Sequence, residues 1–240
     1  MTAAPNDRLP VTVVIPVRNE EMNLPECLSR LDAFAAVVIV DSGSEDRTVA
    51  IAEAAGAEVV QFRWNGRYPK KRNWYLMNYA PATDWVLFLD ADELVDKAFC
   101  AELARTLPMT GHAGFWLKYT NYFLGQPLKH GLTQRKLALF RVGSALYERI
   151  DEQGWSKLDM EVHEHPIVEG IVGEIAARID HDDDRGIGRF IDRHRDYAAW
   201  EARRRQALGS ERAPAGQMLT DRQRFKYRRL GRSWYSAFYF

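Results

Sequence analysis

Short apolar runs alternate with amphipathic stretches along the first ninety residues. Four runs are rich in Val, Ile, Leu or Phe and have the length of buried strands. The stretches between them repeat apolar residues at helical spacing, so strands and helices alternate. This order predicts an α/β fold with a mostly parallel central sheet and helices on both faces. The predicted strands are residues 11–16, 37–40, 58–62 and 85–89, and the predicted helices are residues 21–31, 45–55 (opened by Ser44) and 69–79 (with Pro69 in its first turn).

Polar side chains follow three of these strands at the point where each strand ends. They are residues 18–20 after the first strand, Asp41 after the second, and Asp90 with Asp92 after the fourth. The carboxyl ends of parallel strands share one edge of a sheet, where open α/β folds bind ligands, so we expect the clusters to converge. The basic residues 70–72 open the third helix, and a helix amino end with Lys and Arg suits a phosphate.

The carboxylates of Asp90 and Asp92 are separated by a single residue, Ala91, and repel each other unless a cation lies between them. Hard oxygen ligands of this kind suit Mg²⁺ or Mn²⁺ that holds a phosphate-bearing substrate. The alternative is a strand end followed by a helix whose first turn is acidic. The convergence of three polar clusters, two of them acidic, favours the metal site.

The composition is ordinary for a soluble globular protein, with 46% hydrophobic and 28% charged residues among 240. Cys27 and Cys100 lack metal-ligand spacing and fall in stretches that look helical, which predicts reduced thiols. No stretch has the apolar length of a signal peptide or of a membrane span, so a cytoplasmic protein is expected.

The zero net charge hides a strong asymmetry along the chain. Residues 185–232 carry 14 basic and 5 acidic side chains, whereas residues 1–184 carry 19 basic and 28 acidic ones. This separation indicates a basic face for an anionic partner, such as a membrane surface, a phosphorylated glycolipid or a nucleic acid; a solvated Arg-rich helix is the alternative. A helix from residue 187 onward is expected to pack an apolar stripe on the core. The stripe consists of Ile187, Phe190, Ile191, His194, Tyr197 and Ala198.

The last segment, residues 222–240, mixes six basic side chains with seven aromatic ones. Such interleaving suits a membrane interface, where rings lie at the level of the headgroups and cations meet anionic lipid. It also suits single-stranded nucleic acid, but nothing else in the sequence supports that partner, so no nucleic acid is expected. In a third interpretation the aromatic side chains pack back onto the domain.

Four sequence blocks in the first half of the chain carry a resemblance to a known family. In chain order they are Ile15-Pro16-Val17-Arg18-Asn19-Glu20, Val40-Asp41-Ser42-Gly43-Ser44-Glu45-Asp46-Arg47-Thr48, Lys70-Lys71-Arg72-Asn73 and Phe88-Leu89-Asp90-Ala91-Asp92-Glu93. Together they resemble family 2 glycosyltransferases of the GT-A fold, and more narrowly the bacterial enzymes that add a glucose to the inner core of lipopolysaccharide. Further along, Val162-His163-Glu164 looks like the family's Val-His-Glu motif, and His181 matches a histidine that often closes the next strand.

The resemblance implies a GT-A nucleotide-diphospho-sugar transferase fold, with a Rossmann-like, mostly parallel sheet and a C-terminal helical, basic extension. Residues 1–184 would form one catalytic domain, with a nucleotide-sugar-binding half (1–95) and an acceptor-side half (96–184), and residues 185–240 the extension. The implied reaction moves a hexose from a nucleotide sugar, most simply a UDP-hexose, to a hydroxyl of a glycolipid or surface glycan. The implied location is the cytoplasmic face of the membrane.

The resemblance also assigns residues to the nucleoside of the donor. Pro16, Arg18 and Glu20 would shape its pocket. Asp41 would accept hydrogen bonds from the base, most simply from the ring N–H of uracil.

Four further residues are assigned to the diphosphate and the metal. Arg72, supported by Lys70, would contact the base or the diphosphate. Asp90 and Asp92 would hold the Mg²⁺ or Mn²⁺ that bridges the diphosphate, with Asp90 also in reach of the ribose. Breaking a sugar–phosphate bond leaves negative charge on the departing oxygen, and a metal cation and an arginine at that point stabilise the charge. Asp92 is therefore expected to be catalytic as a metal ligand.

Family 2 enzymes invert configuration by single displacement, so the resemblance implies a carboxylate opposite the leaving group. Glu164 is the expected base, a device worth roughly 10²–10⁴ in rate. A half-exposed strand also explains residues 161–165, and a metal cluster with His163 and His165 is another interpretation. On a strand these histidines share a face that Glu164 does not, which argues against all three acting together. His181 is either a further metal ligand or part of an acidic loop before the next helix.

Other functions remain open from the sequence. A nucleotidyltransferase that acts on sugar phosphates also uses carboxylate-held metal, but it requires a Gly-rich loop after the first strand, and residues 15–20 contain no glycine. A haloacid-dehalogenase-type phosphatase places its Asp-x-Asp after the first strand, whereas here the pair follows the fourth. A non-catalytic module that binds a glycan or a membrane is the remaining alternative.

Overall fold

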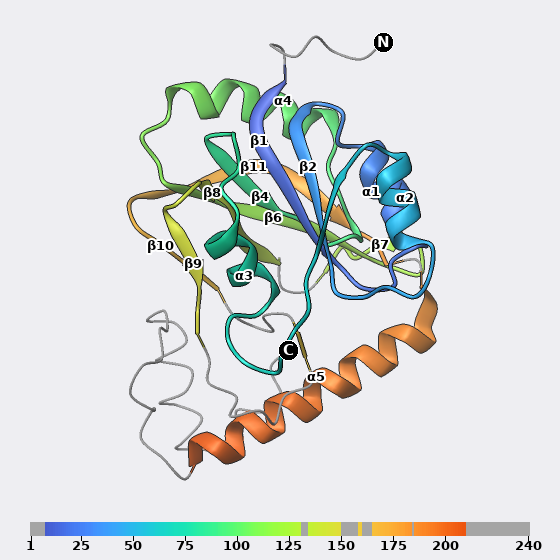
Figure 1. The fold of residues 1–240 in the computed structure, drawn as a ribbon. Helices are drawn as coiled ribbons and strands as arrows, with labels where there is room; N and C mark the ends of the chain where they lie inside the picture. The colour runs from blue at the N-terminus through green and yellow to red at the C-terminus, as the bar shows by residue number, and fades with distance from the viewer. Residues whose placement is uncertain (1–7, 131–133, 150–157, 160–164, 184, 210–240) are drawn as a thin grey trace.

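The computed structural model of the 240-residue chain describes residues 8–130, 134–149, 158–159, 165–183 and 185–209, the last six by their backbone (Figure 1). The aromatic segment 222–240 lies outside these residues. Predictions about that segment therefore stay predictions.

The centre of the structure is a nine-stranded sheet with the order β3-β2-β1-β4-β8-β6-β11-β5, and β7 beside β6. The first four strands of this order are parallel, with Ile15 opposite Ile39 and Val13 opposite Leu87. Their carboxyl ends therefore meet at one edge, as predicted. These strands are β1 (Leu9–Val17), β2 (Phe34–Asp41), β3 (Glu58–Gln61) and β4 (Trp85–Phe88).

The other half of the sheet is mixed. Strand β8 runs antiparallel to both β4 and β6, whereas β11 runs parallel to β6. The two-residue strand β5 follows directly after Asp92 and pairs with the carboxyl end of β11, with Glu93 opposite His181. This pairing brings His181 next to the acidic pair. The strands are β5 (Glu93–Leu94), β6 (Gly114–Phe123), β7 (Gln126–Pro127), β8 (Arg135–Arg141) and β11 (Val172–His181), with β9 (Ala145–Tyr147) and β10 (Pro166–Val168) as a separate ribbon.

Alternate side chains of β1 enter two cores on opposite faces of the sheet. Val13 and Ile15 pack with α1 and α4, where Phe99 is fully buried, and Val14 packs with Tyr75 of α3. Burying each such side chain stabilises the fold by about 1.5–3 kcal/mol. The two cores confirm the predicted α/β fold with helices on both faces. The helices are α1 (Leu24–Ser29), α2 (Thr48–Ala54), α3 (Lys71–Asn78), α4 (Lys97–Thr106) and α5 (Gly186–Gly209), with a 3₁₀ turn at Leu107–Met109.

The first three helices begin later than predicted, at residue 24 rather than 21, 48 rather than 45, and 71 rather than 69. Ser44 does not cap α2 as expected. Its hydroxyl donates to Asp41 and accepts from the backbone N–H of Asn19. Ser, Asn and Asp side chains bind nearby backbone groups in competition with helical hydrogen bonds, so this polar stretch forms a loop at the edge of the sheet.

The predicted C-terminal helix is present as α5 (Figure 1). The prediction that its apolar stripe packs on the core is wrong, because every member of the stripe except the half-buried Tyr197 is exposed, with Ile187 at 52% and Ile191 at 57%. The helix instead turns Arg193, Tyr197 and the buried Trp200 inward. Within the described ranges, no helix combines the length and the apolar character needed to cross a membrane. The division into residues 1–184 and 185–240 stays a prediction.

Candidate active site

The loops that follow β1 and β2 are fastened together at the carboxyl edge of the sheet. Asn19 donates its backbone N–H to Ser44 Oγ at 2.9 Å, and its side-chain oxygen accepts from the N–H of Glu45 at 2.8 Å. Asp41 is 1% exposed and accepts from the N–H groups of Gly43 at 3.0 Å and Ser44 at 3.1 Å. Gly43 has a φ of +81°, which side chains rarely adopt, so glycine lets the loop fold back onto Asp41. Asp41 thus shapes this loop.

The three basic residues at the start of α3 have different surroundings. Lys71 is 2% exposed, donates to the backbone oxygen of Val17 at 3.0 Å and lies 3.3 Å from Asp159. Burial lowers the pKa of Lys71. Lys70 is 6% exposed, whereas Arg72 reaches the carboxyl edge of the sheet. Lys71 therefore links α3 to β1. Of the three basic residues that were expected to bind phosphate, Lys70 and Arg72 remain as candidates.

Asp90 is held by two cations from distant parts of the sequence. Arg72 donates to its Oδ1 at 2.7 Å, and Lys136 of β8 donates to its Oδ2 at 2.7 Å. Lys136 also pairs with the buried Glu93, whose other oxygen accepts from the N–H of Asp90 at 3.1 Å and from the hydroxyl of Tyr119 at 3.4 Å. Both oxygens of Asp90 are thus engaged in short, charge-assisted hydrogen bonds.

These contacts set the charges of the cluster. Burial raises the pKa of Asp90, but Lys136 and Arg72 outweigh it and hold the pKa well below its usual range. Burial also raises the pKa of Glu93, and there it prevails over Lys136. Burial lowers the pKa of Lys136, but Asp90 and Glu93 outweigh it and raise that pKa well above its usual value. Asp90 and Lys136 are therefore both charged at neutral pH.

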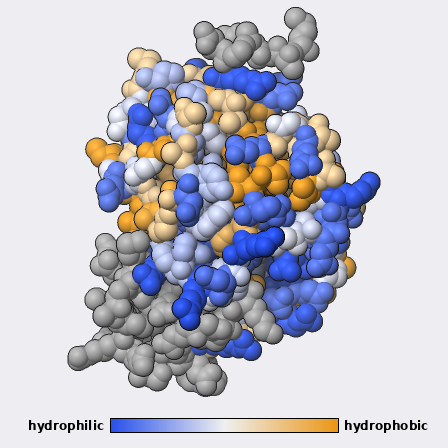
Figure 2. All heavy atoms as spheres, in the orientation of Figure 1, coloured by the Kyte–Doolittle hydropathy of each residue, from blue (hydrophilic) through white to orange (hydrophobic). Residues whose placement is uncertain are grey.

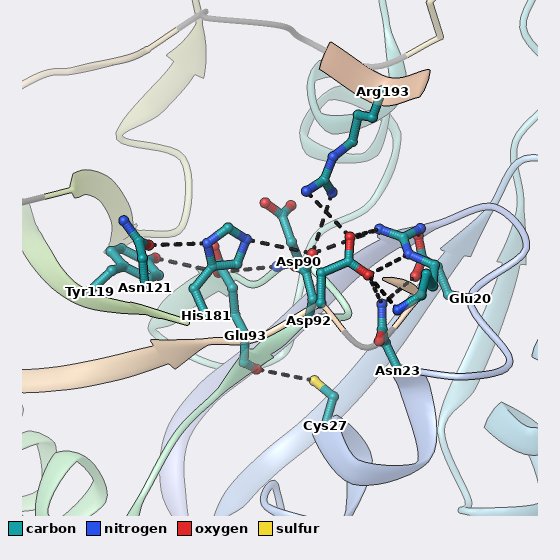
Figure 3. A network of polar contacts seen from close by, with 12 residues as sticks. Glu20, Asn23, Cys27, Asp90, Asp92, Glu93, Tyr119, Asn121, His181 and Arg193 are labelled. Atoms are coloured by element: carbon teal, nitrogen blue, oxygen red, sulfur yellow. Dashed lines mark hydrogen bonds and ion pairs between the residues drawn. The ribbon is translucent and has the colours of Figure 1, made fainter. Parts of the chain in front are cut away.

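Asp92 is 4% exposed, yet its contacts are looser (Figure 3). Its Oδ2 faces Nε2 of His181 at 3.5 Å, Nη1 of Arg193 at 3.4 Å and Nη2 of Arg185 at 3.8 Å. Charge-assisted hydrogen bonds are typically about 2.7–2.9 Å long, so none of the three is a strong one. Burial raises the pKa of Asp92, but His181 outweighs it and lowers that pKa.

His181 is oriented by its second ring nitrogen. Nδ1 lies 3.1 Å from Oδ1 of Asn121, an oxygen that can only accept, so Nδ1 carries a proton and Nε2 faces Asp92. Burial lowers the pKa of His181, but Asp92 outweighs it and raises that pKa. An imidazole fixed by a hydrogen bond on its far side is the usual arrangement of a metal-ligating histidine.

Arg185 joins the loop after β1 to the segment that leads into α5. Its Nη1 donates to Glu20 at 2.5 Å, and its Nε and Nη2 donate to Asp183 at 2.7 and 2.8 Å. Asn23 donates to the same two carboxylates at 3.1 and 3.2 Å. Burial raises the pKa of Glu20 to about 7, although Arg185 opposes it. Glu20 thus lies in the network that surrounds Asp92.

The structure brings together one part of the predicted site. Asp90, Asp92, Glu20 and Arg72 lie in or directly beside the network described above. Four other predicted residues lie at the same edge: Pro16 and Asp41 are buried at the ends of β1 and β2, Arg18 is exposed, and Lys70 is buried at the start of α3. Glu164 and His163 lie outside the described residues, so their predicted roles stay predictions.

Sequence reasoning missed three cations of the site, Lys136, Arg185 and Arg193. Lys136 could have been identified from the sequence, since it is a basic residue directly before the apolar run of β8. The two arginines carried none, because arginine recurs throughout the segment from residue 185 onward.

Asp92 and His181 offer a carboxylate and an imidazole to a divalent cation. In the described part of the chain, no three His, Cys, Asp or Glu side chains are grouped as a cation site. Mg²⁺ needs only one or two protein carboxylates where phosphate oxygens and waters supply the other ligands. The Asp92–His181 pair fits such a cation, whereas both oxygens of Asp90 already bind side chains.

The fold and the site define a class of protein: an α/β protein with a cluster of acidic and basic side chains where the carboxyl ends of its parallel strands meet. The chain belongs to glycosyl transferase family 2, which it matches over residues 12–162. The family predicted from the four sequence blocks is thereby confirmed.

Individual relatives extend this picture. The chain is 30% identical over 174 residues to the lipopolysaccharide core biosynthesis glycosyltransferase LpsC of Rhizobium meliloti. The matched region covers 69% of this chain and 60% of LpsC. The chain therefore spans less than two thirds of that relative. Among solved structures it is similar to S. aureus TarS 1–349 (26% identity, 52% of this chain and 38% of TarS, TM-score 0.40). It is also similar to glucosyl-3-phosphoglycerate synthase from Mycobacterium tuberculosis in complex with Mn²⁺, UDP and glucosyl-3-phosphoglycerate (25% identity, 47% and 44% of the two chains, TM-score 0.37). Likeness at these TM-scores is partial and does not define the ligands of this chain.

Proposed function

We propose that this chain is an inverting, metal-dependent glycosyltransferase that moves a hexose from a UDP-sugar to a hydroxyl of a glycolipid or surface glycan. The observation that carries the proposal is the pair of the buried Asp92 and the half-buried His181, with the guanidinium groups of Arg185 and Arg193 beside the same carboxylate oxygen. Such a site can hold a divalent cation and a diphosphate together. A cation and arginines at this place stabilise the negative charge that develops when a nucleoside diphosphate departs.

Asp92 and His181 would hold the cation, Mg²⁺ or Mn²⁺. When bound, the cation neutralises the charge that develops on the departing diphosphate. Asp90 would take a different part, because Arg72 and Lys136 fix its carboxylate in one orientation. A fixed carboxylate suits a hydroxyl of the ribose or of the transferred sugar. This assignment narrows the expectation that both aspartates bind the metal.

The nucleoside would lie against the ends of β1 and β2, beside Pro16, Arg18 and Glu20. Asp41 lies at this edge, where its two oxygens accept four contacts from Gly43 and Ser44. The sequence block that contains Asp41 supports a place beside the base, and one of the two contacts from the N–H of Ser44 would give way to the ring N–H of uracil.

The diphosphate would lie over the amino end of α3. Arg72 faces this region, and Lys70 is the residue directly before the helix. Backbone N–H groups at a helix amino end and an arginine are both suited to phosphate oxygens.

Glu164 would be the base, and its place in the Val-His-Glu motif supports this assignment. It would take the proton of the acceptor hydroxyl while the oxygen forms its bond to the anomeric carbon and the bond to the diphosphate breaks. Attack from the face opposite the diphosphate gives inversion. A base in this position contributes roughly 10²–10⁴ in rate.

The acceptor would be presented at the cytoplasmic face of a membrane. The name of LpsC refers to lipopolysaccharide core biosynthesis, which supports a glycolipid. The rings of the exposed Phe190 of α5 and the exposed Phe123 at the end of β6 are 5.5 Å apart, and Ile187 and Ile191 in the same turns of α5 and Leu124 directly after β6 are exposed as well. Figure 2 shows mainly hydrophilic side chains at the lower right, where α5 begins in Figure 1. Apolar side chains framed by polar ones suit a lipid surface.

A thermal-shift screen of nucleotide sugars with and without Mn²⁺ tests the donor. We expect a UDP-hexose to raise the melting temperature only with the cation, because a ligand of the folded state stabilises it. No response to any nucleotide sugar would contradict the proposal. In a transfer assay with the identified donor, Asp92→Asn should lose UDP release, whereas Glu26→Gln, a change at an exposed ion pair of α1, should retain it.

A further inference from the structure

Arg193 reaches from α5 to Asp92 without forming a short hydrogen bond (Figure 3). Its Nη1 lies 3.4 Å from Oδ2 of Asp92, and its Nη2 lies 3.3 Å from Oδ2 of Asp183. Its Nε is buried and has no hydrogen-bond partner among the described residues. A guanidinium presents five N–H donors in a rigid fork that matches two acceptor oxygens at once. The guanidinium of Arg193 therefore makes only long contacts with the described residues in its present position.

Arg185 provides the contrast within the same network. It makes hydrogen bonds of 2.5 Å to Glu20 and of 2.7 and 2.8 Å to Asp183, so its contact of 3.8 Å with Asp92 is the least of its interactions. Arg185 is anchored whether or not Asp92 has another partner. Of the two arginines, Arg193 is held less firmly, because its contacts with Asp183 and Asp92 are 3.3 and 3.4 Å long.

A divalent cation held by Asp92 and His181 would compete with Arg193. Nε2 of His181 and Nη1 of Arg193 both approach the same carboxylate oxygen, Oδ2 of Asp92. A cation bound there repels the guanidinium and takes its acceptor. A change in the side-chain conformation of Arg193 would release it from Asp92, while Arg185, directly before α5, keeps its hydrogen bonds to Glu20 and Asp183.

We propose that Arg193 is a positioning residue that exchanges between Asp92 and the diphosphate of the donor, and so makes cation binding depend on the nucleotide. This inference rests on the proposed function. Without the donor, Arg193 neutralises Asp92 and weakens the binding of the cation alone. With the donor, the released fork binds phosphate oxygens bidentately, a geometry that arginine favours. Cation and nucleotide then strengthen each other's binding by the same factor.

Binding measurements on the whole chain test this exchange without an activity assay. Mn²⁺ binding is followed by the electron paramagnetic resonance signal of the free ion, and UDP binding by calorimetry at saturating Mn²⁺. We expect Arg193→Gln to bind Mn²⁺ alone about 5-fold more tightly and UDP about 30-fold more weakly, within the usual range of coupling between sites. Arg189→Gln, at an exposed position one turn earlier in α5, is the matched control and should change neither constant more than about twofold.

The outcomes separate this inference from the proposed function. If the wild-type chain binds UDP no better with Mn²⁺ than without it, the proposed function fails. If the wild type shows that coupling but Arg193→Gln behaves like Arg189→Gln, the exchange alone is wrong. Should Arg193→Gln not fold, Arg193→Lys decides, because it keeps the charge and loses the fork. If Arg193→Lys binds UDP at least about 5-fold more weakly than the wild type while its affinity for Mn²⁺ alone changes little, the exchange is supported. If Arg193→Lys has wild-type affinity for both ligands, the exchange is wrong.

Discussion

Asp90 and Asp92 lie two residues apart at the same edge of the sheet, yet their surroundings differ sharply. Each oxygen of Asp90 accepts from a cationic side chain at 2.7 Å. At Asp92, three nitrogens approach one oxygen and none comes closer than 3.4 Å. Short charge-assisted hydrogen bonds fix a carboxylate, whereas long contacts leave it able to accept a ligand. These contacts favour different parts for the two aspartates: Asp90 as a fixed part of the framework and, under the proposed function, Asp92 as the ligand of the cation.

The largest expected effect is that of Asp92→Asn on transfer. Loss of the metal ligand removes several kcal/mol of charge stabilisation in the transition state, so kcat/KM should fall by about 10³. Thermal stability should change little, because Arg185 keeps Glu20 and Asp183 as partners. Initial rates and calorimetry measure the two quantities. A variant within tenfold of wild-type activity would remove Asp92 from the reaction.

Asp90→Asn should act first on stability. It leaves the amino group of the half-buried Lys136 and the guanidinium of Arg72 without their shared carboxylate. We expect the free energy of unfolding to fall by about 2 kcal/mol, near the lower end for a broken buried ion pair, since Asp90 is partly exposed. Urea denaturation measures the change, and the exposed Asp32→Asn is the control. Equal stability of the two variants would mean that Asp90 is not held as described.

Asn121→Ala tests whether His181 binds the cation together with Asp92. The substitution removes the acceptor that fixes the ring of His181. Loss of such a support typically weakens metal binding 10–100-fold, and we expect about tenfold for Mn²⁺ measured in the presence of UDP. An unchanged affinity would mean that His181 is not a ligand.

Glu20→Gln tests the network through pH. The pKa of Glu20 is raised to about 7 in the folded chain from 4.5, so its contribution to stability is present below pH 4.5 and is lost as the pH rises through about 7. The unfolding free energy of the wild type should therefore fall relative to that of Glu20→Gln between pH 5 and pH 7.5, by on the order of 1 kcal/mol. Urea denaturation across this pH range measures the difference. A constant difference would show that Glu20 has an ordinary pKa.

The positions of both aspartates could be predicted from the sequence, and so could the fold. A short apolar run such as Trp85–Phe88 is buried on both faces, and in a parallel sheet its end must lie at the edge that binds ligands. The family blocks added the expectation of a metal. Neither source distinguished Asp90 from Asp92, because the two residues have the same chemistry and nearly the same place in the chain.

The difference between them arises from partners that are remote in sequence. Lys136 follows Asp90 by 46 residues, and Arg193 follows Asp92 by 101. Lys136 reaches Asp90 because β8 lies antiparallel beside β4, and His181 reaches Asp92 because the two-residue strand β5 pairs with β11. A strand of two residues has no periodicity to read. Local side-chain hydrogen bonds misled in the same way at Ser44, which binds Asp41 instead of capping α2.

Mn²⁺ titration in the presence of UDP, on the wild type, Asp92→Asn and Asp90→Asn, tests most directly whether the two aspartates differ as described. We predict that Asp92→Asn abolishes saturable Mn²⁺ binding, while a folded Asp90→Asn keeps an affinity within about fivefold of the wild type. Loss of Mn²⁺ binding in Asp90→Asn together with its retention in Asp92→Asn would contradict the assignment of the cation to Asp92 and His181.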